Sequence, residues 1–164
     1  MKIESSEVVE TNDYRVLIYP ASRPFTPKES KAITEKLFDF LSTWAAHGKP
    51  LSSSFKIDKN QFIVITIDEE KEVASGCSID ALNAVMREID AEYNLGLFDR
   101  MKACFIEQGE LKTMTLQDFR SALKEGRLSH DIEVFDFSKS TYVAYLSDFL
   151  LPLKRSWAGI YVDA

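Results

Sequence analysis

The first hundred residues alternate between short apolar runs and longer segments whose apolar residues recur at helical spacing. Residues 26–44 and 77–94 each place apolar side chains on one face, which predicts two helices that pack against a sheet. The apolar runs are rich in β-branched and aromatic residues and predict strands at 14–19, 55–57, 62–67 and 102–106. The order βαββαβ is that of the ferredoxin-like split βαβ arrangement, so we expect an α+β fold.

The residues after Gln108 extend this core. Turn, cap and breaker residues predict a strand at 111–114, a short helix from Thr115 to Gly126, a strand at 132–135 and a last helix from about 139 to 150. We therefore expect one domain over residues 1–164, with a core of about 14–107 and a C-terminal α/β extension of about 108–164.

The strand at 62–67 is apolar on both faces, because Ile63 and Ile65 alternate with Phe62 and Val64. Such a strand needs cover on both sides of its sheet. We expect the two helices to cover one face, and the C-terminal extension or a second subunit to cover the other.

Local signals predict where the first helix begins and ends. Thr26, Pro27 and Glu29 have the spacing of a capping box with proline in the first turn, which predicts a helix start. Gly48 is placed to end this helix as the residue just past it, with His47 in the last turn.

Composition and charge narrow the classes of function. The chain has 164 residues, of which 45% are hydrophobic and 28% charged, values typical of soluble globular proteins. Its net charge of −6 argues against broad binding to nucleic acid or anionic membrane. No apolar run reaches the length of a membrane span, and the first residues lack the apolar core of a signal peptide, so we expect a cytoplasmic protein.

The two cysteines, Cys77 and Cys104, are too few for a disulfide framework and lack the clustered spacing of a zinc site. We expect no metal ion and no cofactor. Cys104 lies in an apolar run and is expected in the core, whereas Cys77 lies at a predicted helix start.

The helix start at Cys77 is the candidate site. Free backbone N–H groups and the positive end of the helix dipole favour an anion or a thiolate there. The expected topology brings the end of the first helix to the same rim as the start of the second. Our hypothesis is a small anionic ligand bound at this rim, with contacts from Ser75, Gly76, Ser78, Asp80 and Trp44.

Two other functions stay open. In a cysteine-dependent enzyme, Cys77 would be the nucleophile and His47 its charge partner. In an interaction module, the second face of the sheet would contact another chain, such as a second copy in a homo-oligomer. Arg87 and Arg100 can neutralise an anion, but the expected topology puts Arg100 at the opposite edge from Cys77. A purely structural helix cap also explains the Ser75–Asp80 segment, as core packing explains Trp44.

The chain contains, in this order, the blocks Trp44-Ala45-Ala46-His47-Gly48, Phe62-Ile63-Val64-Ile65, Ser75-Gly76-Cys77-Ser78-Ile79-Asp80, Phe98-Asp99-Arg100 and Ser156-Trp157. Together these blocks resemble a family of small uncharacterised bacterial proteins that often carry the label ABC transporter ATPase. The residues do not support that label, because the chain has no Gly-x-x-x-x-Gly-Lys-Ser/Thr phosphate loop. The resemblance implies no established activity.

Overall fold

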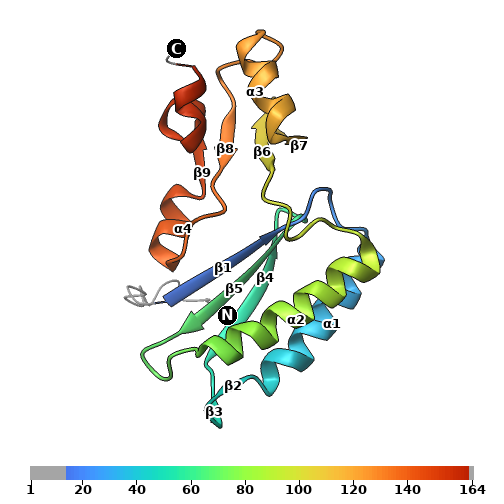
Figure 1. Ribbon diagram of the computed structural model, residues 1–164, viewed down its shortest axis with the longest axis vertical. Coiled ribbons are helices and arrows are strands. Elements are labelled where there is room, and N and C mark those ends of the chain that lie inside the picture. The colour runs from blue at the N-terminus through green and yellow to red at the C-terminus, as the bar shows by residue number, and fades with distance from the viewer. Residues whose placement is uncertain (1–13, 163–164) are drawn as a thin grey trace, which may run out of the picture.

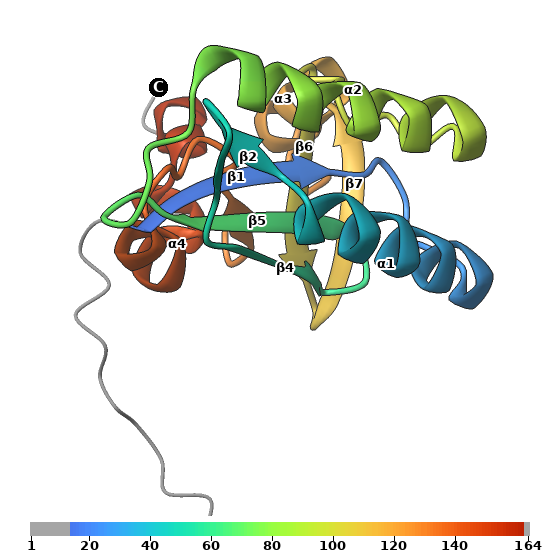
Figure 2. The ribbon, with the colours of Figure 1, turned by 90° about the horizontal axis from the view of Figure 1, so that it is seen from below.

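The computed structural model of the protein describes residues 14–162. Its first part is a three-stranded antiparallel sheet in the order β1 (Tyr14–Pro20), β5 (Phe62–Asp68), β4 (Ser53–Asp58). Helices α1 (Pro27–Ser42) and α2 (Gly76–Tyr93) lie side by side along one face of this sheet (Figures 1 and 2). The predicted strand and helix segments of this half are thereby confirmed.

The predicted start of α1 is confirmed in atomic detail. The Thr26 side chain accepts a hydrogen bond from the Glu29 backbone N–H at 3.2 Å, and the Glu29 carboxylate accepts one from the Thr26 N–H at 2.9 Å. These two bonds satisfy donors that the first turn of a helix leaves free. At the other helix, Asn94 ends α2 in the left-handed conformation, with φ 52°.

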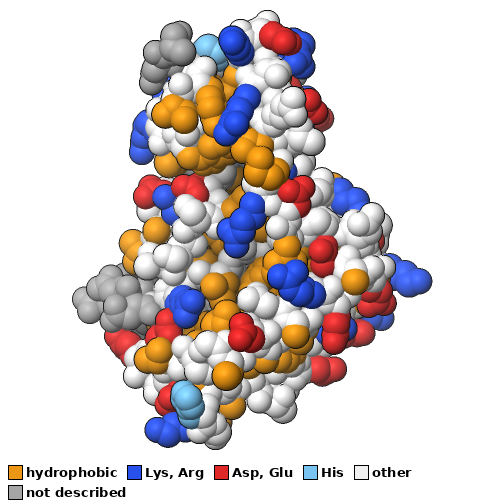
Figure 3. Space-filling model, in the orientation of Figure 1, with side chains coloured by type: hydrophobic (Ala, Val, Ile, Leu, Met, Phe, Trp, Pro, Cys, Tyr) orange, Lys and Arg blue, Asp and Glu red, His pale blue; other side chains and the backbone are white. Residues whose placement is uncertain are grey.

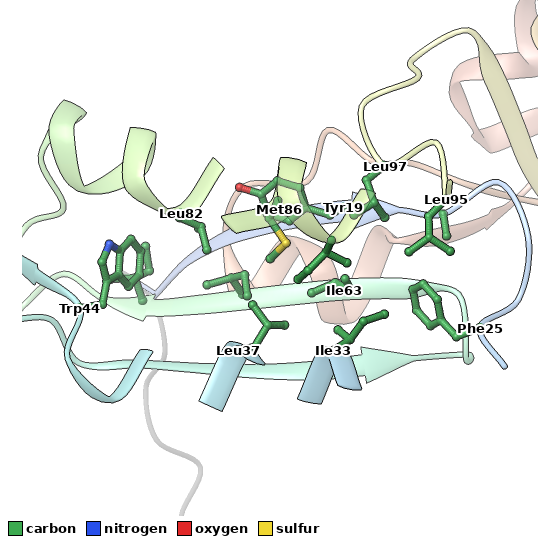
Figure 4. Close-up of a cluster of buried hydrophobic side chains, with 14 of the residues drawn as sticks. Tyr19, Phe25, Ile33, Leu37, Trp44, Ile63, Leu82, Met86, Leu95 and Leu97 are labelled. Atoms are coloured by element: carbon green, nitrogen blue, oxygen red, sulfur yellow. The ribbon is translucent and has the colours of Figure 1, made fainter. Parts of the chain in front are cut away.

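The main core lies between the two helices and the sheet (Figure 4). Both helices direct one apolar stripe at β5, which is buried on both faces. The fully buried side chains of this layer include Ile33, Leu37, Ile63, Ile65, Leu82 and Met86. Burial of each such side chain contributes about 1.5–3 kcal/mol, so this layer fixes how the helices lie on the sheet.

The second part of the chain forms its own four-stranded antiparallel sheet. The order is β7 (Glu110–Thr115), β6 (Lys102–Glu107), β8 (Glu133–Phe135), β9 (Leu150–Pro152). Helix α3 (Leu116–Lys124) packs on it, α4 (Tyr142–Asp148) precedes β9, and two 3-10 helices, Leu153–Arg155 and Trp157–Tyr161, follow. The predicted last helix is therefore shorter than expected, and β9 was not predicted.

The α+β class is confirmed, but the ferredoxin-like arrangement is not. In that arrangement the fourth strand would lie beside the first. Here β6 pairs with β7 and β8 and belongs to a different sheet from β1. The physical reason is that β6 builds a separate core, in which Ala103 and Phe105 pack with Phe119 of α3. The two sheets are visible as the lower and upper parts of Figure 1.

A buried lysine fixes the start of β6 to the end of β1. The Lys102 ammonium donates hydrogen bonds to Pro20 O at 2.6 Å, Gly96 O at 2.6 Å and Ser22 Oγ at 3.0 Å. Lys102 is only 5% exposed. The two sheets thus meet at this point through a side chain rather than through strand pairing.

The C-terminal half covers the second face of the first sheet. Phe62 and Val64 on that face are 0% and 1% exposed. The Phe62 ring centroid lies 4.8 Å from that of Phe135 and 5.3 Å from that of Phe149. The sequence predicted that either the C-terminal extension or a second subunit covers this face, and in the structure the C-terminal extension does so.

The predicted end of α1 is wrong in its details. The helix ends at Ser42, and His47 and Gly48 form the two-residue turn of a small hairpin between β2 (Ala45–Ala46) and β3 (Lys49–Pro50). Both turn residues have positive φ, 51° and 78°, as a tight hairpin turn requires. Glycine with positive φ suits a helix end and a hairpin turn equally, which explains the error.

Within residues 14–162, no helix is long and apolar enough to cross a membrane.

Candidate functional site

The rim predicted from the sequence exists. The Trp44 indole N–H, just after α1, donates a 2.8 Å hydrogen bond to the backbone carbonyl of Ser78 in the first turn of α2. These residues are 34 positions apart in the chain, and the bond is buried. The end of the first helix and the start of the second therefore meet, as expected. Trp44 itself is 4% exposed and belongs to the main core.

The side chains at the start of α2 are already engaged with each other. Ser75 is the N-cap, and its hydroxyl accepts from Ser78 N at 3.1 Å. The Ser78 hydroxyl donates back to Ser75 O at 2.7 Å. Gly76 follows in the first turn, and the Asp80 carboxylate takes no part in these bonds. The helix start is therefore self-capped.

Cys77 and His47 are both exposed, the thiol in the first turn of α2 and the imidazole in the β2–β3 turn. Within residues 14–162 no hydrogen bond joins them. Their pairing as nucleophile and charge partner stays a prediction. Cys104 is buried as expected, and burial raises the pKa of its thiol, although Thr113 acts in the opposite direction through a hydrogen bond.

A large cleft lies elsewhere, between the first sheet, α2 and the second part of the chain. Its volume is about 950 Å³, at the upper end of the range for ligand sites. One side is formed by β1, whose outer edge has no neighbouring strand from residues 14–162 along most of its length. We call it the β1 cleft; it is lined by residues 16–20, Ile79, Asn83, Arg87, 97–100, Lys102, Leu116, 136–140 and Trp157.

The wall formed by α2 and the following loop is held by aromatic contacts. The Tyr19 hydroxyl donates to Asn83 Oδ1 at 2.7 Å, and Figure 4 shows this hydroxyl directed toward α2. The Tyr19 and Phe98 rings pack in a T-shaped arrangement, with a centroid distance of 5.9 Å and an interplanar angle of 71°. The Arg87 guanidinium lies over the Phe98 ring, 4.1 Å from its centroid. Burial raises the pKa of Tyr19 to about 12, so its hydroxyl stays a neutral donor.

The opposite wall carries Lys139 and Asp136, whose Nζ and Oδ2 are 3.2 Å apart. Burial acts to raise the pKa of Asp136, but hydrogen bonds from Ser138 and the Lys139 ammonium lower it below its ordinary value. This carboxylate is therefore charged and already satisfied at neutral pH. The other acidic residue of the cleft, Asp99, accepts from Met101 N at 2.9 Å.

Positive charge in the β1 cleft exceeds negative charge. Four basic residues line it against these two carboxylates. Lys139 is paired and Lys102 is fully hydrogen-bonded, whereas Arg87 and Arg100 form no ion pair with any residue between 14 and 162. Figure 3 shows Lys and Arg side chains among hydrophobic ones in the hollow between the two parts of the molecule. The cleft is a locally basic site on a protein of net charge −6.

Sequence reasoning missed this cleft as a site. It named Arg87 and Arg100 but set Arg100 aside, because it placed the strand after Arg100 in the first sheet. The departure of β6 is what opens the space beside β1 and brings the two arginines to one cavity. Among the described residues, no cluster of three His, Cys, Asp or Glu side chains can hold a metal ion.

No family model, curated protein or solved structure matches the chain.

Proposed function

We propose that the protein is a binding protein whose β1 cleft takes an anionic ligand. The observation that carries the proposal is the pair of arginines, Arg87 and Arg100, in a cleft whose two carboxylates already hold other partners. A guanidinium presents a rigid fork of donors that matches carboxylate and phosphate oxygens. The mixed apolar and basic lining suits a ligand that carries both an anionic group and an apolar part.

The proposed ligand is an anion, as the sequence led us to expect, but its proposed site is the β1 cleft and not the start of α2. At the start of α2, Ser75 and Ser78 use their hydroxyls to cap the helix. In the β1 cleft, by contrast, the guanidinium groups have hydrogen-bond donors to offer. Ile79, Asn83 and Arg87 recur at intervals of four residues along α2, so one face of that helix forms the wall.

A titration with citrate tests the proposal. We expect binding by isothermal titration calorimetry at low ionic strength, weakened by added salt because exposed charges are screened. Replacement of both arginines, Arg87→Gln with Arg100→Gln, is expected to lower the affinity at least tenfold.

The matched control is Arg155→Gln. Arg155 is exposed, lies outside the cleft and has no ion-pair partner among the described residues. It should leave citrate binding unchanged. Equal loss of affinity in the control and in the double variant would mean that citrate responds to overall charge, and the proposal would fail.

A further inference from the structure

Alternation along β1 shows which backbone groups face the cleft. In the antiparallel register, Leu17 lies opposite Ile65 and Ile18 opposite Val64. Just past the end of β1, Ala21 N donates to Gln61 O in the same register. Because hydrogen-bonded positions alternate along an antiparallel strand, the odd-numbered residues of β1 direct their N–H and C=O groups at β5. Val16 N donates to Ser140 O on the other side. The N–H and C=O of Ile18 therefore point away from β5 and into the cleft.

These two groups of Ile18 have no hydrogen-bond partner among residues 14–162. The positions on either side along the same edge are occupied. Val16 N–H binds Ser140 O at 2.9 Å, and Pro20 O accepts from Lys102 Nζ at 2.6 Å. The open stretch thus spans the four residue steps between Val16 and Pro20, about 13 Å at the rise of a strand.

The chain itself shows that an extended backbone fits against this edge. Arg15 and Thr141 form an isolated antiparallel bridge, so the segment before α4 already pairs with the beginning of β1. The pairing stops after Val16, where the cleft opens. A strand edge with unpaired N–H and C=O groups is a template for addition of another strand.

We propose that the ligand of the β1 cleft is an extended peptide with an acidic side chain, which adds to the free edge of β1 by pairing with Ile18. This inference rests on the proposed function and deepens it. A peptide backbone offers a C=O and an N–H at the spacing that the two groups of Ile18 require, which a small anion does not. The acidic side chain meets Arg87 and Arg100, and apolar side chains meet Phe98 and Trp157.

The test begins with a phage-displayed library of random heptapeptides selected on the full chain. The most enriched peptide is then synthesised and titrated into ¹⁵N-labelled protein. We expect enrichment of sequences with Asp or Glu, and a shift of the Ile18 amide signal on binding. N-methylation of each internal peptide amide in turn is expected to lower affinity at least tenfold at alternate positions only, because every second amide of a strand faces its neighbour.

Two protein variants separate backbone pairing from charge. Ile18→Pro removes the outward N–H without removing a bond to β5, and proline is tolerated at such edge positions. It is expected to lower peptide affinity at least tenfold and to lower citrate affinity by a much smaller factor, because citrate takes its contacts from Arg87 and Arg100. Ile18→Val keeps the N–H and is the matched control, expected to bind both as the original chain does.

Failure of the inference and failure of the proposed function give different results. Citrate binding without any enriched peptide, or with peptides that bind Ile18→Pro as tightly as Ile18→Val, overturns the peptide inference alone. Equal affinity of all N-methylated peptides for the unaltered protein overturns it as well, whether or not Ile18→Pro folds. Absence of both citrate and peptide binding overturns both proposals.

Discussion

Replacement of Lys102 by methionine tests whether the two parts of the molecule are joined as described. The Lys102 ammonium holds three oxygens, Pro20 O, Gly96 O and Ser22 Oγ, and each N–H of the ammonium has one of them. Methionine has a similar length and fills the same space, but it donates no hydrogen bond. The change therefore removes the polar link and leaves most of the packing in place.

The expected magnitude follows from these bonds. Hydrogen bonds to a charged group contribute about 1.5–3 kcal/mol each, so three bonds at the lower value give about 4.5 kcal/mol. Burial of the ammonium opposes this, and it also lowers the pKa of Lys102. Methionine recovers part of that desolvation free energy, so we expect the free energy of unfolding to fall by about 2–3 kcal/mol.

Urea denaturation followed by tryptophan fluorescence measures the change. The control is Lys112→Met, in the neighbouring strand β7, where the lysine is 41% exposed and pairs with Glu107 at 2.7 Å. An exposed pair of this kind contributes about 0–1 kcal/mol. Equal destabilisation by the two substitutions, or a loss below about 0.5 kcal/mol for Lys102→Met, would show that the Lys102 ammonium does not join the two parts of the molecule.

Three further predictions follow from single contacts. Trp44→Phe removes the indole N–H bonded to Ser78 O and should lower the free energy of unfolding by about 1–3 kcal/mol, measured in urea; an unchanged midpoint would show that the bond is absent. Hydrogen bonds from Arg23 hold the pKa of Glu29 at about 2. The contribution of the Glu29 carboxylate to the free energy of unfolding is therefore fully present above the unfolded pKa of 4.5 and is lost as pH falls toward 2. Because the Arg23 side chain is 41% exposed and glutamine can still cap the Thr26 N–H, we expect Glu29→Gln to lower the free energy of unfolding by about 0.5–1 kcal/mol at pH 7. The difference between variant and original should shrink in acid unfolding, and a constant difference down to pH 2 would contradict this. Burial raises the pKa of Tyr19 from 10 to about 12, so its contribution to the free energy of unfolding is full below pH 10 and is lost as pH rises toward 12. Tyr19→Phe should therefore lose less free energy of unfolding over this pH range. Parallel pH profiles of the two proteins would count against a buried neutral hydroxyl.

Features that depend on neighbouring residues could be predicted from the sequence. The capping box at Thr26 and Glu29 is such a feature, because its bonds join residues three positions apart. The two-residue turn at Gln108 and Gly109 is another, since both residues have positive φ as a tight hairpin requires. The meeting of Trp44 with Ser78 was reached through the topology of the first two helices, which the sequence predicted correctly.

The strand pairing of β6 could not be predicted in the same way. Its apolar pattern fits a position beside β1 as well as a position in a second sheet. The choice is made by distant residues, Phe119 of α3 and Val134 of β8, which pack with Phe105 in a separate core. The β1 cleft exists only because of this choice, so the site it forms was not visible in the local pattern.

Amide hydrogen exchange along β1 measures whether the edge of this strand is open. We expect slow exchange for the Val16 amide, which faces Ser140, and for the Leu17 amide, which faces β5. The Ile18 amide faces the cleft and should exchange at least a hundredfold faster. Protection of the Ile18 amide equal to that of the Leu17 amide in the free protein would show that the edge is already paired and not open to a peptide.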